Sequence, residues 1–78
     1  MEGQFKVVKI EENAITVEHC DQRHTYRFNV ALDADERRIL SKSPLIAQND
    51  RAKHSAAFWE ADAFAFAERE ARQKGMIE

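Results

Sequence analysis

Apolar and polar residues alternate in three segments near the start of the chain, and this pattern predicts three β-strands. The segments are 4–10, 14–19 and 24–30. Short polar turns at 11–14 and 20–23 separate them, and Asn13 in the first turn tolerates a left-handed backbone. Turns this short make consecutive strands antiparallel, so the three segments predict a β-meander.

The register of the meander follows from the requirement that apolar side chains share one face. Centring the first hairpin on 12–13 and the second on 21–22 meets this requirement, and it pairs Val8 with Val17. A shift of one residue in either hairpin would scatter the apolar side chains over both faces. The predicted core face comprises Val8, Ile10, Ile15, Val17, Tyr26, Phe28 and Val30.

The middle of the chain predicts a short helix followed by an ambiguous segment. Asp33-Ala34-Asp35-Glu36 resembles a capping box, which opens a helix. Ser43-Pro44 would end it, because the residue before a proline avoids helical geometry. The segment 44–49 fits a loop, a helical turn or an edge strand.

The last third of the chain predicts a long amphipathic helix that begins between Asp50 and Ala56 and ends at Gly75. Its aromatic residues Phe58, Trp59 and Phe66 are expected to cover the apolar face of the sheet. The predicted fold class is therefore α+β: a three-stranded antiparallel β-meander with a short connecting helix and a long C-terminal helix packed on one sheet face.

The chain length of 78 residues predicts a single domain, 1–78, with a small core and a thin stability margin. Cys20 is the only cysteine, so no internal disulfide can supplement that core, and self-association is the expected supplement. A lone cysteine favours a reducing compartment, and no apolar run approaches the ~20 residues that span a bilayer. We therefore expect a cytoplasmic protein that does not enter membranes.

The Phe64 side of the predicted helix is the first candidate binding surface. Phe64 points away from the aromatic residues assigned to the sheet, and it shares its side with Ala57, Ala61 and Ala71. Small and aromatic residues that the core does not need suit a protein interface. The alternative is that the short helix or segment 44–49 covers Phe64 within the monomer. The leading hypothesis is a non-enzymatic protein-interaction module, homodimeric through this helix or through an open sheet edge, or bound to an unidentified protein partner.

Charge patterning suggests a second candidate, a nucleic-acid surface. The net charge is −2, but segment 37–54 holds five basic residues and one acidic residue, a local net of +4. Together with the outer face of the sheet it offers Lys9, Arg23, Arg27, Arg37 and Arg38 as contacts for phosphates. Against this, only Phe5 could stack on a base, and pairing between Glu and Arg across the strands would explain the same residues. Nucleic-acid binding is thus the runner-up.

His19, Cys20 and His24 are the third candidate, because their side chains include metal ligands and a nucleophile. Alternation places Cys20 on the face opposite both histidines, and no second ligand pair completes a tetrahedral site. A catalytic thiol would need an imidazole within hydrogen-bonding reach, and glycine-rich phosphate loops are absent from the sequence. The sequence therefore predicts no metal, no cofactor and no enzymatic activity.

Overall fold

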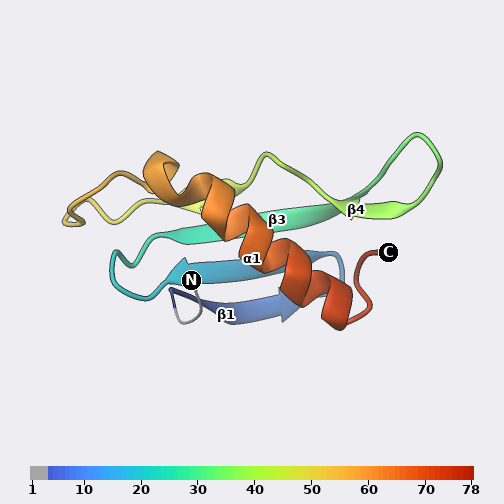
Figure 1. Cartoon of the computed structure of the whole chain (residues 1–78), viewed down its shortest axis with the longest axis horizontal. Coiled ribbons are helices and arrows are strands. Elements are labelled where there is room, and N and C mark those ends of the chain that lie inside the picture. Colours follow the sequence, from blue (N-terminus) through green and yellow to red (C-terminus); the bar gives the residue numbers. More distant parts are fainter. Residues whose placement is uncertain (1–3) are drawn as a thin grey trace.

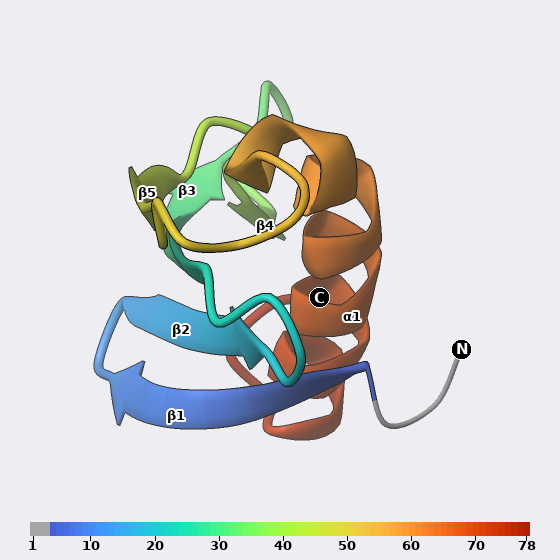
Figure 2. The same cartoon turned by 90° about the vertical axis from the view of Figure 1, so that its left-hand side faces the viewer.

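The computed structural model describes residues 4–78 and has an α+β fold in which an antiparallel sheet carries one helix on a single face (Figures 1 and 2). A short 3₁₀ turn, η1, leads directly into the helix, α1. The elements in chain order are β1 (Phe5–Glu11), β2 (Ala14–His19), β3 (Thr25–Leu32), β4 (Arg38–Leu40), β5 (Leu45–Ala47), η1 (Ala56–Trp59) and α1 (Glu60–Gln73).

The sheet extends the predicted meander by two short strands. The order is β1-β2-β3-β4, and β5 also pairs with β3. β4 lies against the Leu32 end of β3 and β5 against its Thr25 end, so these two strands follow one another along the same side of β3. The predicted count of three strands was therefore too low, and segment 44–49 contains an edge strand.

The predicted register is confirmed between β2 and β3 but is wrong in the first half of β1. Ile10 faces Ile15 as expected, yet Val7, not Val8, faces Val17 because a β-bulge interrupts the pairing between Val7 and Lys9. The bulge inserts one extra residue and so reverses the alternation that precedes it. As a result Phe5 and Val7 pack on the core, whereas Val8 is 46% exposed.

A β-hairpin replaces the short helix that the capping-box pattern predicted. One carboxylate oxygen of Asp33 accepts hydrogen bonds from the backbone N–H groups of Asp35 (2.8 Å) and Arg37 (2.9 Å). Glu36 has a φ of 61°, which is a turn conformation and not a helical one. An aspartate that caps a helix can equally stabilise a turn, and pairing of the following strand with β3 decides the outcome here.

The end of α1 matches the prediction, while its start lies later than expected. Ser55 precedes η1, and α1 itself begins at Glu60. At the other end Gly75, with a φ of 75°, donates its N–H to Arg72, and Met76 donates to Ala71. These two bonds form a Schellman motif, in which glycine is favoured because it adopts positive φ without steric cost. Within residues 4–78, no helix is long and apolar enough to cross a membrane.

The helical segment contacts the sheet through a row of alanines flanked by Trp59 and Phe66, both of which pack against the core as predicted; the prediction is wrong only for Phe58. Ala63, Ala67 and Ala71 have no exposed surface, whereas Phe58 is 62% exposed. The large side chains of the core come from the sheet instead, with Ile15, Val17, Tyr26 and Phe28 fully buried. Small residues on α1 let the helix approach a sheet face that bulky side chains already fill.

Candidate functional site

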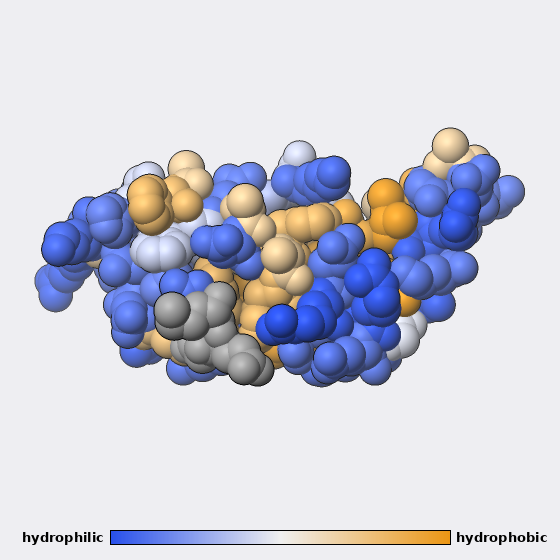
Figure 3. Space-filling model, in the orientation of Figure 1, coloured by the Kyte–Doolittle hydropathy of each residue, from blue (hydrophilic) through white to orange (hydrophobic). Residues whose placement is uncertain are grey.

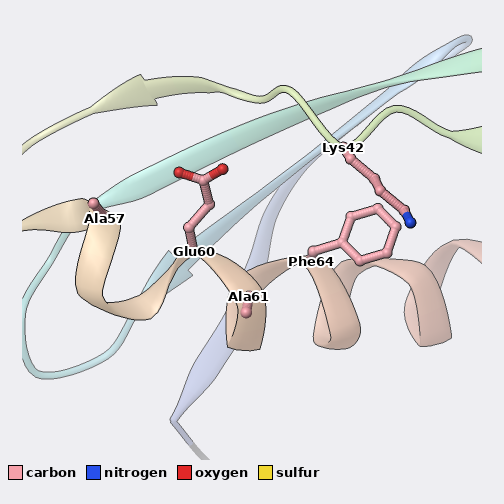
Figure 4. Close-up of a pocket in the computed structure, with 5 residues that line it drawn as sticks. All are labelled: Lys42, Ala57, Glu60, Ala61 and Phe64. Atoms are coloured by element: carbon pink, nitrogen blue, oxygen red, sulfur yellow. The ribbon is translucent and has the colours of Figure 1, made fainter.

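An open groove runs along α1 on the side that faces the chain between β4 and β5 (Figure 4). Its volume is about 510 Å³. We call it the α1 groove, and its lining residues are Lys42, Ala57, Glu60, Ala61 and Phe64. Three of these, Ala57, Ala61 and Phe64, belong to the surface that the sequence pattern singled out.

Phe64 forms part of the groove wall and also supports the core. Its ring meets Phe28 edge to face, with 5.7 Å between the ring centroids. The side chain is half-buried, so neither β4 nor β5 covers it completely. Ala57 and Ala61 are exposed beside it, and small side chains there keep the groove open.

Two opposite charges face the groove. Lys42 reaches toward Phe64 from the linker between β4 and β5, while Glu60 projects from the first turn of α1 (Figure 4). Within residues 4–78, neither charge has an ion-pair partner within 4.0 Å. An apolar wall flanked by one cation and one anion suits an amphipathic protein surface.

Tyr26 fixes the start of the helical segment that carries the groove. Its hydroxyl donates a 2.6 Å hydrogen bond to the backbone oxygen of Ala56, and both residues are buried. Burial, and next the negative charge of Glu60, raise the pKa of the Tyr26 phenol to about 12. The phenol therefore remains a hydrogen-bond donor throughout the physiological pH range.

Ala71, the fourth residue assigned to this surface, lies elsewhere. It has no exposed surface because it packs on the sheet with Ala63 and Ala67. A helix of 3.6 residues per turn places positions 63, 67 and 71 along one line, and that line faces the core. Ala71 therefore takes no part in the α1 groove.

Further exposed apolar residues lie on β5. Leu45 is 65% exposed, Ile46 is 39% exposed and Ala47 is also exposed. On the face that carries α1, apolar surface emerges between hydrophilic side chains along the middle of the molecule (Figure 3). The sequence pattern did not distinguish a strand from a loop or a helical turn at 44–49. The one feature there that is typical of an edge strand is an uncharged run that begins at Pro44.

The basic residues of the nucleic-acid hypothesis are mostly engaged in ion pairs. Arg27 donates two hydrogen bonds to Glu11, from Nε to Oε1 at 2.9 Å and from Nη2 to Oε2 at 3.3 Å. This interaction lowers the pKa of Glu11 and raises that of Arg27. The other paired arginines contact an acidic residue as follows: Arg23 with Glu18, Arg37 with Asp35, and Arg38 with Glu78.

Lys9 is the remaining member of that set, and it shares no ion pair within the described part of the chain. It lies on β1 opposite Thr16, on the face away from α1. The arginines at 37 and 38 lie at the far end of β3, near the β3–β4 turn, and not beside Lys9. The structure therefore does not gather the basic residues into one unpaired patch.

The two histidines of the third candidate are engaged in holding loops. His24 is fully buried; its Nδ1 accepts the N–H of Asn49 at 2.9 Å, and its Nε2 lies 2.7 Å from the backbone oxygen of His54. This arrangement requires the neutral tautomer with its proton on Nε2. His24 thus ties the loop after β5 to the turn between β2 and β3.

His19 has a similar role in its own turn. Its Nδ1 accepts the backbone N–H groups of Asp21 (3.1 Å) and Gln22 (3.0 Å), so the proton of the neutral ring is on Nε2. Burial lowers the pKa of His19, and its ring packs against Trp59 with 4.4 Å between centroids. Both Nδ1 atoms thus accept backbone N–H groups, and residues 4–78 contain no group of three ligands able to hold a metal.

Comparison with known proteins adds nothing to these observations: no family model, curated protein or solved structure matches the chain.

Proposed function

We propose that this chain is a non-enzymatic protein-interaction module that forms a homodimer through the α1 groove and the adjacent strand β5. One observation carries the proposal: a groove of about 510 Å³ with Phe64 in its wall stays open after the monomer has completed its core. Contiguous apolar surface of this kind on a soluble domain is typical of an interaction site.

The charges of the groove support a second copy as the partner. A two-fold axis brings the same surface of two copies together, so that residue i meets residue j and j meets i. Lys42 of one copy can then face Glu60 of the other, and the reverse contact forms at the same time. Both charges are unpaired within the described monomer, so their pairing requires no internal bond to break.

Nucleic-acid binding has less support from the geometry. A phosphate at Arg27 would have to displace the two hydrogen bonds to Glu11, and Arg23 is similarly engaged with Glu18 at 3.3 Å. Domains that bind nucleic acid usually present unpaired positive charge on one face. The pairing across β1, β2 and β3 is instead that of a solvated sheet face.

Sedimentation velocity over concentrations from about 1 μM to 1 mM tests the proposal, because that range covers weak to moderate dimers. We expect reversible dimers, and we expect Ala61→Arg to weaken self-association at least tenfold by placing a long cation in the groove. Gln73→Arg is the matched control, since it adds the same charge to an exposed site about 18 Å along the same helix.

A wild-type chain that remains monomeric at 1 mM would refute homodimerisation. If Ala61→Arg and Gln73→Arg both dimerise like the wild type, the α1 groove is not part of the interface. Retention of single-stranded RNA at low salt, with steep weakening as salt is added, would favour the nucleic-acid alternative.

A further inference from the structure

The edges of the sheet differ in how well they are protected against pairing with another strand. β1 carries the charged residues Lys6 and Lys9 and a bulge after Val7, all of which discourage strand addition. On β4, Arg38 is covered by the end of the chain: its N–H donates to the Glu78 carboxylate at 3.0 Å, and its C=O accepts the Glu78 N–H at 3.0 Å. β5 has neither kind of protection.

The hydrogen bonds of β3 determine which backbone groups of β5 point outward. The C=O of Asn29 accepts the N–H of Ser41, so Asn29 faces the side of β3 where β4 and β5 lie. The N–H of Val30 donates to Asn13 and therefore faces β2. Because the direction alternates along an antiparallel strand, Thr25 and Arg27 face β5 as Asn29 does.

Ile46 must then point its backbone away from the sheet. Thr25 pairs with Ala47, Arg27 with Leu45, and Tyr26 with Ile46. The first two pairs exchange hydrogen bonds, so the intervening Ile46 presents its N–H and C=O at the open edge. No side chain or loop within residues 4–78 bonds to either group.

We propose that β5 pairs with β5 of a second copy, antiparallel and with Ile46 opposite Ile46 across a two-fold axis. This inference rests on the proposed homodimer and specifies its contact. The two Ile46 residues exchange a reciprocal pair of N–H···O=C hydrogen bonds, and Leu45 of each copy faces Ala47 of the other. The two sheets then become one continuous sheet.

The sequence of the strand favours a second copy over an unrelated partner. When a strand pairs with a second copy of itself, a charged residue lies near the same charge on the other copy, and the two charges repel each other. Segment 43–49 contains no charged residue, whereas β1 contains Lys6, Lys9 and Glu11. Pro44 lacks an N–H, which ends the ladder on that side and limits the possible registers.

Three residues of strand are too little for a stable dimer, since specific interfaces bury about 1,200–2,000 Å² in total. The α1 groove supplies further surface, because Lys42, which lines it, lies three residues before the start of β5 (Figure 4). Ile46 is on the same face of the sheet as Tyr26, its partner on β3, and this is the face that carries α1. The edge contact and the groove contact can therefore form together.

Ile46→Lys tests the inference against a matched control on the other edge, Ile10→Lys. The two isoleucines have similar exposure, 39% and 49%, so the substitutions alter the monomer to a similar extent. We expect Ile46→Lys to weaken dimerisation at least tenfold in sedimentation, because two like charges would meet at the two-fold axis. We expect Ile10→Lys to dimerise like the wild type, and unchanged circular dichroism would show that both variants fold.

Cross-linking provides a positive test in the Cys20→Ser background. Facing Cα atoms of a hydrogen-bonded pair lie about 5.5 Å apart, within the range that a disulfide spans. Adding Ile46→Cys should give disulfide-linked dimers on mild oxidation, whereas adding Ile10→Cys should not. If the wild type dimerises, but Ile46→Lys does not weaken the dimer and Ile46→Cys does not cross-link, the β5 contact is wrong and the homodimer stands. If the wild type is a monomer, both the β5 contact and the homodimer are wrong.

Discussion

The alanine contact between α1 and the sheet predicts a strong asymmetry between two chemically identical substitutions on one helix. Ala67 has no exposed surface and lies in the row of alanines packed on the sheet, whereas Ala65 is exposed. Ala67→Leu adds three carbon atoms where Phe28, Tyr26 and the other large side chains already fill the space. Ala65→Leu adds the same atoms in contact with solvent.

The expected cost of Ala67→Leu is about 1–3 kcal/mol, the usual range for overpacking a filled core. A domain of this size has a free energy of unfolding of about 4–12 kcal/mol, so the loss is a substantial fraction of it. The thermal midpoint of a 60–100-residue domain falls by roughly 4–8 °C per kcal/mol, which predicts a decrease of at least about 4 °C. Ala65→Leu should stay within about 0.5 kcal/mol of the wild type.

Urea unfolding followed by circular dichroism measures both variants, with the thermal midpoint as a second reading. The measurement should be made at a concentration where sedimentation shows the same oligomeric state for all three proteins. Equal stabilities for Ala67→Leu and Ala65→Leu would refute the close contact between the alanine row and the sheet.

Two pH-dependent predictions follow from the buried ionisable side chains. Burial lowers the pKa of His19 in the folded chain. Near pH 6 the unfolded chain therefore binds more protons than the folded chain. The stability that neutral His19 contributes is complete above about pH 6.5, and it is lost as the pH falls through the folded-state pKa. Urea midpoints from pH 8 to 5.5 should therefore decline, and the decline should be shallower in His19→Gln; an identical slope would contradict the assignment. The phenol of Tyr26, the only tyrosine, has its pKa raised to about 12 by burial, so its contribution is complete below about pH 10 and is lost as the pH rises toward 12. Ultraviolet titration of the folded chain should show phenolate only near pH 12, and ionisation near pH 10 would show that Tyr26 is not buried as the structure has it.

The histidine contacts explain how so small a domain orders its long loop. His24 bonds to the backbone at Asn49 and His54. Gln22 accepts a hydrogen bond from the side-chain amide of Asn49 at its backbone oxygen and one from the His54 N–H at its Oε1. These bonds fix both ends of the segment between β5 and η1.

The features that depend on local pattern could be predicted from the residues alone. The alternation of apolar residues defined β2 and β3 and their register, since a shift would expose Ile15, Val17, Tyr26 and Phe28. Gly75 marked the end of the helix because its positive φ is a property of one residue. The same local reasoning identified Ala57, Ala61 and Phe64 as a surface on one side of the helix.

The features that depend on contacts between distant residues became visible in the folded chain and not before. The bulge beside Val8 occurs where β1 pairs with β2, and the turn at Asp33 occurs where β4 pairs with β3, so both depend on strands that the local pattern does not specify. The row of alanines takes the centre of the contact with the sheet, with Trp59 and Phe66 beside it, because the large side chains of the sheet already fill that space, and no single segment specifies this. The open edge at Ile46 likewise arises because β5 pairs with β3 on one side only, and the direction of its backbone follows from bonds made elsewhere in the sheet.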